Sequence, residues 1–168
     1  MTPLTQAFGA TKVAFTKSMQ EVEGVLSLHG IRESRFTHAR PQRAPKTSFD
    51  VSQETAGYVL YEFVKGKDDD QRGVRITVRY QPRIGPKGGL TGSTAEMAGR
   101  ALYWYLKGKF DAIDYGIEEF DVAFMPHLMT ALGTTFAEQP SLITEVIYRP
   151  ESIALIAPST TKQLPRGN

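Results

Sequence analysis

Apolar and polar residues alternate most regularly between positions 74 and 81. The apolar positions are Val74, Ile76, Val78 and Tyr80. The polar positions between them are Arg75, Thr77 and Arg79. Because successive side chains of a β-strand point to opposite faces, this alternation predicts a strand with one packed face and one cationic face. The cationic stretch continues through a Gly/Pro-rich loop to Lys87.

Two further extended segments precede this strand. Residues 57–65 predict a strand with apolar side chains on both faces, and the loop at 66–73 returns the chain into the alternating segment. The two runs therefore predict an antiparallel hairpin. A shorter strand is expected around residues 34–38. It leads into a Pro-rich basic loop over residues 39–50, which cannot be a central strand because proline lacks the N–H that a sheet ladder needs.

The first helix is expected between Ser18 and Gly30. Ser18 and Glu21 have the spacing of a capping box, in which each side chain bonds to a backbone amide at the helix start. Gly30 suits the left-handed position that follows a helix, and Ile31 can then pack back on the last turn. The pattern predicts a short amphipathic helix.

The clearest helical pattern runs from about residue 94 to residue 115. Ser93 and Glu96 repeat the capping-box spacing, and Gly116 follows the last turn. Apolar residues recur at helical spacing at Ala98, Leu102, Leu106, Phe110 and Ile113. This stripe is expected to pack on the sheet. A short helix is expected next, ending at Pro126 and covering one end of the core with Ile117, Phe120, Ala123 and Phe124.

These elements predict an α+β fold in the order α-β-β-β-α. In it, a small antiparallel sheet of about three strands packs on one long helix, followed by a short helix and an extended C-terminal tail. We expect one domain over residues 1–157, with the basic loop 39–50 inserted in it. A further strand is expected at 142–148, and residues 158–168 are expected to form a flexible tail.

Composition narrows the class of protein without naming an activity. The 168 residues, 40% of them apolar, are enough for one folded domain. No apolar run approaches the roughly 20 residues that a membrane span needs. The chain has no cysteine, which excludes disulfides and thiolate chemistry and fits a reducing compartment. We therefore expect a cytoplasmic protein.

The net charge of +2 is too small to indicate a polyanion partner by itself. However, the cations cluster in two acid-free stretches, at 35–49 and 72–87. We expect a phosphate-contacting set made of Arg40, Arg43, Lys46, Arg75, Arg79, Arg83 and Lys87. Tyr80, or Tyr103 on the long helix, is the candidate for stacking on a base. The competing interpretation is that these cations are ordinary solvated loop residues.

No group of residues indicates catalysis. Glu62 and Lys65, beside the acidic loop 68–70, offer the ingredients of a metal-dependent nuclease. These two residues are three apart on a strand, so their side chains point to opposite faces and cannot converge. The three histidines have no partner at a recognised ligand or triad spacing. We therefore expect a binding protein rather than an enzyme, with no catalytic residue, metal or cofactor.

Three motifs stand out between Glu21 and Pro126 and just beyond: EVEGVLSLHGI, RALYWYLKGKFDAIDYGI and EEFDVAFMPHLM. With these motifs, the segment from Glu21 to Pro126 resembles an uncharacterised family of bacteriophage and mobile-element proteins. It implies a bacteriophage setting in an infected host cell, and it supplies no catalytic residue. The element order is also similar to that of double-stranded RNA-binding domains and to the βββα core of single-strand annealing proteins.

Together these observations favour a phage-type protein that binds nucleic acid through the phosphate backbone with low sequence specificity. Single-stranded DNA is the favoured partner, with binding or annealing as its function. The alternative is a non-enzymatic interaction or assembly protein, for example a phage inhibitor of a host factor. A metal-dependent nuclease is the third hypothesis. A homo-oligomer and a host protein remain open as partners, and no membrane partner is expected.

Overall fold

The computed structural model describes residues 8–9, 11–41, 56–67, 70–84 and 90–139. This part of the chain has the predicted α+β architecture and the predicted order α-β-β-β-α. The main elements are α2 (Phe15–Leu28), β1 (Glu33–Ala39), β2 (Gly57–Lys65), β3 (Arg72–Tyr80) and α3 (Ala95–Asp114). The smaller elements are β4 (Pro82–Ile84), β5 (Leu90–Gly92), α4 (Phe120–Phe124) and the 3₁₀ helices η3 (Met125–His127) and η4 (Phe136–Glu138).

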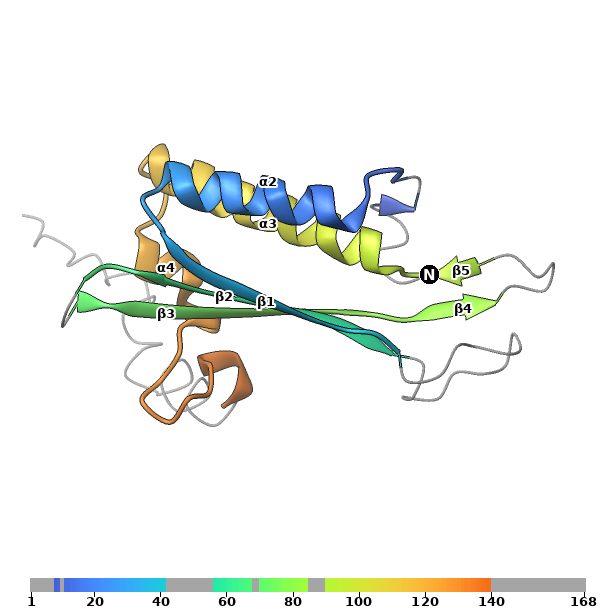
Figure 1. Cartoon of the computed structure of the whole chain (residues 1–168). Helices are drawn as coiled ribbons and strands as arrows, with labels where there is room; N and C mark the ends of the chain where they lie inside the picture. Colours follow the sequence, from blue (N-terminus) through green and yellow to red (C-terminus); the bar gives the residue numbers. More distant parts are fainter. Residues whose placement is uncertain (1–7, 10, 42–55, 68–69, 85–89, 140–168) are drawn as a thin grey trace, which may run out of the picture.

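The sheet is antiparallel with the strand order β1-β2-β3, so β2 is central. The predicted hairpin of β2 and β3 is confirmed, and its register places Glu62 opposite Arg75. On the other side of β2, Glu62 faces Arg35. Figure 1 shows α2 and α3 side by side on one face of the sheet. The segment from α4 to η4 starts at one end of the core, where Phe124 packs against Phe110. It then passes the start of β3 and reaches the other face, where the Gly133 carbonyl accepts from Arg75.

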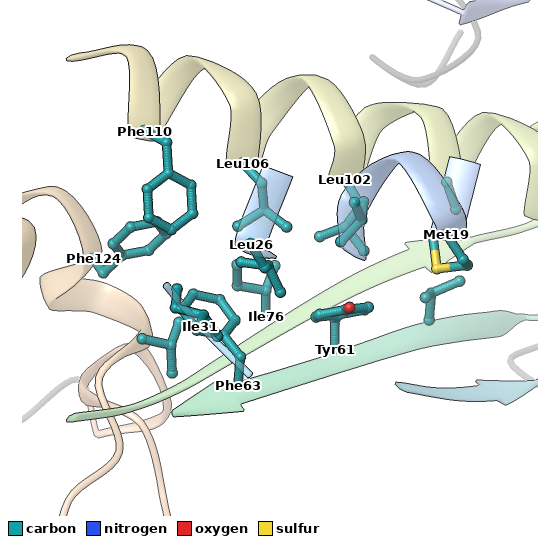
Figure 2. Packing of buried hydrophobic residues seen from close by; sticks show 14 of the residues in the cluster. Met19, Leu26, Ile31, Tyr61, Phe63, Ile76, Leu102, Leu106, Phe110 and Phe124 are labelled. Atoms are coloured by element: carbon teal, nitrogen blue, oxygen red, sulfur yellow. The ribbon is translucent and has the colours of Figure 1, made fainter. Parts of the chain in front are cut away.

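The core lies between the two helices and the sheet, as Figure 2 shows. The α3 stripe was correctly predicted, because Ala98, Leu102, Leu106 and Phe110 have no exposed surface. Alternate residues of β2 and β3 meet this stripe from below and include Tyr61, Phe63 and Ile76. Burying each such side chain contributes about 1.5–3 kcal/mol. The packed face of the sheet is therefore the face that carries the helices.

The predicted start of the first helix is wrong. The helix begins at Phe15, and Ser18 lies inside it, fully buried. The Ser18 Oγ has no hydrogen-bond partner in the described structure, so it caps nothing. A Cβ placed on Gly99 of α3 would lie 3.3 Å from the Ser18 Cβ, which shows how closely the helices approach there. Ser18 is thus a small contact residue between two helices.

The predicted end of the same helix is confirmed. Gly30 has a φ of +74°, and the Ile31 N–H donates to the Leu26 carbonyl at 3.0 Å. This is the Schellman arrangement, in which the residue after the glycine packs against the helix. Ile31 is accordingly buried. The turn directs the chain from α2 into the edge of the sheet.

The cap of α3 is displaced by one residue from its predicted position. Thr94 is the N-cap, and its hydroxyl accepts from the Met97 N–H at 3.4 Å. Ser93 is buried instead, and its Oγ accepts from the Gln81 N–H at 2.8 Å. Ser93 therefore ties the start of α3 to the end of β3.

The short helix α4 ends where Pro126 enters η3, as predicted. Ala123 and Phe124 are buried, and Phe120 packs partly against the core. Ile117 was expected to join them, but 72% of its surface is exposed. Its backbone completes the turn at Gly116, which points the side chain away from the core. The predicted strand at 142–148 and the tail at 158–168 lie outside the described residues.

Candidate functional site

The face of the sheet opposite α2 and α3, called the open face below, carries the polar side chains of β3. The strand register arranges its residues in rows across the three strands. One row contains Arg35, Glu62 and Arg75. The next row contains Thr37, Leu60 and Thr77. The last contains Ala39, Tyr58 and Arg79, at the end where the basic loop leaves β1.

The first row is an ion-pair ladder. The Arg35 Nε donates to Glu62 Oε2 at 2.5 Å, and the Arg75 Nε donates to Glu62 Oε1 at 2.9 Å. Arg75 also donates to the Gly133 carbonyl at 2.8 Å. Glu62 is 7% exposed, so both carboxylate oxygens are satisfied away from bulk water. Its pKa lies below the ordinary value because Arg35, and then Arg75, stabilise the ionised carboxylate more than burial disfavours it.

This ladder revises the expected role of Arg75. Its guanidinium is committed to Glu62 and Gly133, and 22% of its side chain is exposed. A phosphate contact would have to compete with a buried carboxylate at hydrogen-bonding distance. Arg72, at the start of the same strand, pairs with Asp70 at 3.0 Å and with Asp121 at 3.3 Å. The first half of the cationic strand therefore serves mainly to hold the fold.

The expected role of Tyr80 in base stacking does not fit its position. Tyr80 is 5% exposed, and its ring lies on the helix-covered face of the sheet. Its hydroxyl lies 2.7 Å from the His38 Nε2. Burial, and then the charge of Arg40, lowers the pKa of His38 below its ordinary value. Tyr80 thus closes one end of the core, on the helix-covered face of the sheet.

Arg79 is the predicted cation whose position fits an open binding surface. Its side chain is exposed on the open face, opposite Tyr58 on the neighbouring strand. No salt bridge to Arg79 exists among the described residues. Arg40 follows the end of β1 at the same end of the sheet and is also exposed. Its charge acts on His38 and Tyr80, which lie on the helix-covered face. We therefore call Tyr58 and Arg79 alone the Tyr58 site.

Tyr58 was missed as a site residue. The alternation of the strand at 57–65 already put it on the face away from Val59 and Tyr61. Both faces of that strand are partly apolar, so the pattern did not tell which face would be covered by helices. In the structure 41% of Tyr58 is exposed, which makes it the accessible aromatic residue of the open face.

The other predicted contacts are only partly described. Arg43, Lys46 and Lys87 lie outside the described residues. The backbone of Arg83 forms part of β4, directly after the strand that carries Arg79. Tyr103 is half-buried under the Arg100 guanidinium, whose Cζ lies 4.3 Å from the ring centre. It is therefore less accessible to a base than Tyr58.

The ingredients of the nuclease hypothesis are separated in space. Glu62 is held by its two arginines on the open face, whereas the Lys65 Nζ lies 4.8 Å from the centre of the Phe120 ring. Within the described ranges, no group of three or more His, Cys, Asp or Glu residues could hold a metal ion. A groove of about 530 Å³ borders the ladder, lined by residues that include Arg32, Val64 and Met129.

Comparisons with known proteins found no relative. No family model, no curated protein and no solved structure matches this chain. None of the helices in the described ranges is long and apolar enough to cross a membrane.

Proposed function

We propose that this protein binds single-stranded nucleic acid at the Tyr58 site. The proposal rests on one relationship: an exposed tyrosine lies directly opposite an exposed arginine that has no salt bridge in the described part of the chain. An aromatic ring offers a stacking surface to a base, and an arginine beside it reaches the adjoining phosphate. The two groups therefore fit one nucleotide unit.

The position of the site supports a single strand over a duplex. A base can stack on Tyr58 only when it is unstacked from its neighbours, as in single-stranded DNA or RNA. Double-stranded RNA-binding domains, whose element order is similar, open their last helix with basic residues. Here the first turn of α3 carries Glu96 and no basic residue. A duplex contact at that helix end would bring an acid against a phosphate.

The surroundings of the site support weak sequence preference. The nearest row toward the ladder contains Thr37, Leu60 and Thr77, which provide hydroxyl and methyl contacts but no fixed set of donors and acceptors. Stacking tolerates every base because each has a π-face. Affinity then comes from a few phosphate contacts and stacking, so it decreases as salt increases.

The biological setting belongs to the same proposal. The motifs between residues 21 and 126 resemble those of bacteriophage and mobile-element proteins. That resemblance supports a role in the cytoplasm of an infected host cell, where phage replication and recombination expose single-stranded DNA. Binding or annealing of such strands is the activity we infer.

Fluorescence anisotropy with labelled oligonucleotides tests the proposal. The wild-type protein is titrated against a mixed-sequence single strand and against the matching duplex at low salt. We expect tighter binding of the single strand. Replacing Tyr58 with alanine should weaken it by about 1–3 kcal/mol, the usual value of one stacked base.

Tyr115→Ala is the matched control. Tyr115 is 83% exposed at the C-terminal end of α3, away from the open face, so its removal should leave the affinity unchanged. Equal losses in the Tyr58 and Tyr115 variants would contradict stacking at this site. Absence of binding by the wild-type protein at low salt would reject the proposed function altogether.

A further inference from the structure

The outer edge of β3, on the side away from β2, is already paired at both ends. At its start, the Met129 N–H donates to the Gly73 carbonyl at 2.8 Å, and Val74 forms an antiparallel bridge with Leu128. The His127 ring lies next to the backbone of Arg75. Just beyond the end of the strand, the Ser93 N–H donates to the Gln81 carbonyl at 3.1 Å. The chain therefore adds its own segments to this edge.

Between these contacts, no described segment of the chain pairs with the edge. In an antiparallel strand, the main-chain groups of alternate residues point toward the same neighbour. Since the carbonyls of Gly73 and Gln81 bond outward, Thr77 and Arg79 also direct their N–H and C=O groups to the outer side. No backbone partner for them exists among the described residues. These two residues form a short gap in an otherwise paired edge.

An apolar groove lies directly beside this gap. It has a volume of about 320 Å³ and runs between β3 and α3. Its lining residues are Ile76, Val78, Ala101, Leu102, Tyr105 and His127. A residue paired opposite Val78 has its side chain on the same face of the sheet as Val78, which is the face of the groove. A strand added at the gap would thus place one side chain in the groove.

We propose that the β3 edge from Ile76 to Tyr80 binds a short extended segment of a partner protein by strand addition. The segment supplies main-chain groups to Thr77 and Arg79 and an apolar side chain to the groove. Its residue opposite Arg79 lies beside that guanidinium on the open face, so an acidic residue is favoured there. The occupant is therefore an apolar and acidic peptide segment.

A second copy of the chain does not fit this edge through β3 itself. β3 has nine residues, whereas the gap is closed by His127 and Met129 at one end and by Ser93 at the other. A twofold axis through Thr77 would also place Arg75 opposite Arg79 of the copy, and like charges in that position destabilise a pair. A short segment with free ends avoids both obstacles.

Nuclear magnetic resonance titration of the full chain tests the proposal without nucleic acid. The probe is a short capped peptide with a central leucine, a glutamate next to it, and threonine and valine at the outer positions. We expect saturable shifts in the backbone amides of Thr77, Val78 and Arg79, and slower hydrogen exchange at Thr77. A peptide with aspartate in place of leucine should cause no saturable shift.

Two variants separate the two parts of the contact. Ala101→Leu fills the groove from α3 and should weaken peptide binding at least tenfold. Thr77→Pro removes an N–H that points outward. An edge strand tolerates proline at such a position, so the bonds to β2 are kept, and the substitution should also weaken peptide binding. No saturable shift with the leucine peptide, or unchanged binding in both variants, would overturn the proposal.

Failure of the peptide experiment can be distinguished from failure of the proposed nucleic-acid binding. Ala101 lies on α3, on the helix-covered side of the sheet, so Ala101→Leu should leave oligonucleotide binding at the Tyr58 site unchanged. Peptide binding without oligonucleotide binding would support the edge site alone. Oligonucleotide binding without peptide binding would support the Tyr58 site alone.

Discussion

The Nε of Arg75 donates to the Oε1 of Glu62 at 2.9 Å, across the pair of strands β2 and β3. Glu62 is buried and also accepts from Arg35 on β1, so one carboxylate links all three strands of the sheet. A strand that looks like a uniform cationic surface in the sequence is thus divided by function. Arg75 stabilises the sheet, and Arg79, two rows further along the same face, remains exposed.

Replacement of Arg75 by alanine should destabilise the fold. Glu62 would keep Arg35 but lose its more buried partner, and the Gly133 carbonyl would lose its donor. We expect a loss of about 1.5–3 kcal/mol in the free energy of unfolding, the usual contribution of a hydrogen bond to a charged group. Urea denaturation followed by circular dichroism measures this loss.

Arg79→Ala is the control for that experiment. Arg79 lies on the same face of the same strand and forms no ion pair in the described ranges, so its removal should change stability by about 0.5 kcal/mol or less. If the two alanine variants were equally stable, the ion-pair ladder would not contribute to the stability of the fold.

The pH dependence of stability should report the protonation of Glu62. Because its pKa is lower in the folded state, its contribution is complete above the ordinary carboxyl value of 4.5. The contribution is lost as the pH decreases from there through the folded-state pKa. Glu62→Gln should be less stable than the wild-type protein at neutral pH and should show a shallower decrease in acid.

Denaturation curves at closely spaced pH values between neutrality and acid measure this difference. Parallel curves for the wild-type protein and the Glu62→Gln variant would mean that other carboxyl groups cause the acid sensitivity.

Two glycines of α3 should respond oppositely to alanine. A Cβ on Gly99 would lie 2.9 Å from the Phe15 Cδ2 and 3.3 Å from the Ser18 Cβ, so Gly99→Ala should destabilise by about 1–3 kcal/mol through overpacking. A Cβ on Gly108 would meet nothing within 4 Å. Gly108→Ala should therefore stabilise by about 0.5–1 kcal/mol, the gain in helix propensity.

Thermal unfolding of both variants tests this assignment of helix contacts. Similar melting temperatures for the two would show that α2 and α3 do not approach closely at Gly99.

The regular parts of the fold could be predicted because local patterns decide them. The alternation along β3 predicted which of its residues would be buried, and the stripe on α3 predicted its buried side. Helix starts were less predictable, because Ser18 and Ser93 both have the residue type and the spacing of helix caps. Tertiary contacts instead buried Ser18 against α3 and bonded Ser93 to Gln81. Propensity yields to packing where a small residue is needed.

The site was less predictable than the fold. A hairpin that pairs Lys65 with Arg72 places Glu62 opposite Arg75. This half of the ladder could therefore have been predicted from the hairpin register. The second arginine of the ladder comes from β1, whose register the sequence did not define. Tyr58 could not be distinguished as exposed until the helices were seen to cover only one face.

The salt dependence of oligonucleotide binding tests the central claim most directly. Kd for a single-stranded oligonucleotide is measured from low to moderate salt for the wild-type protein, Arg79→Ala and Lys67→Ala. Each removes one positive charge, but Lys67 lies in the turn that follows the far end of β2 from Tyr58. We predict weaker binding and a slope of log Kd against log salt reduced by about 0.7 for Arg79→Ala alone. An unchanged slope in Arg79→Ala, or an equal change in Lys67→Ala, would contradict the account.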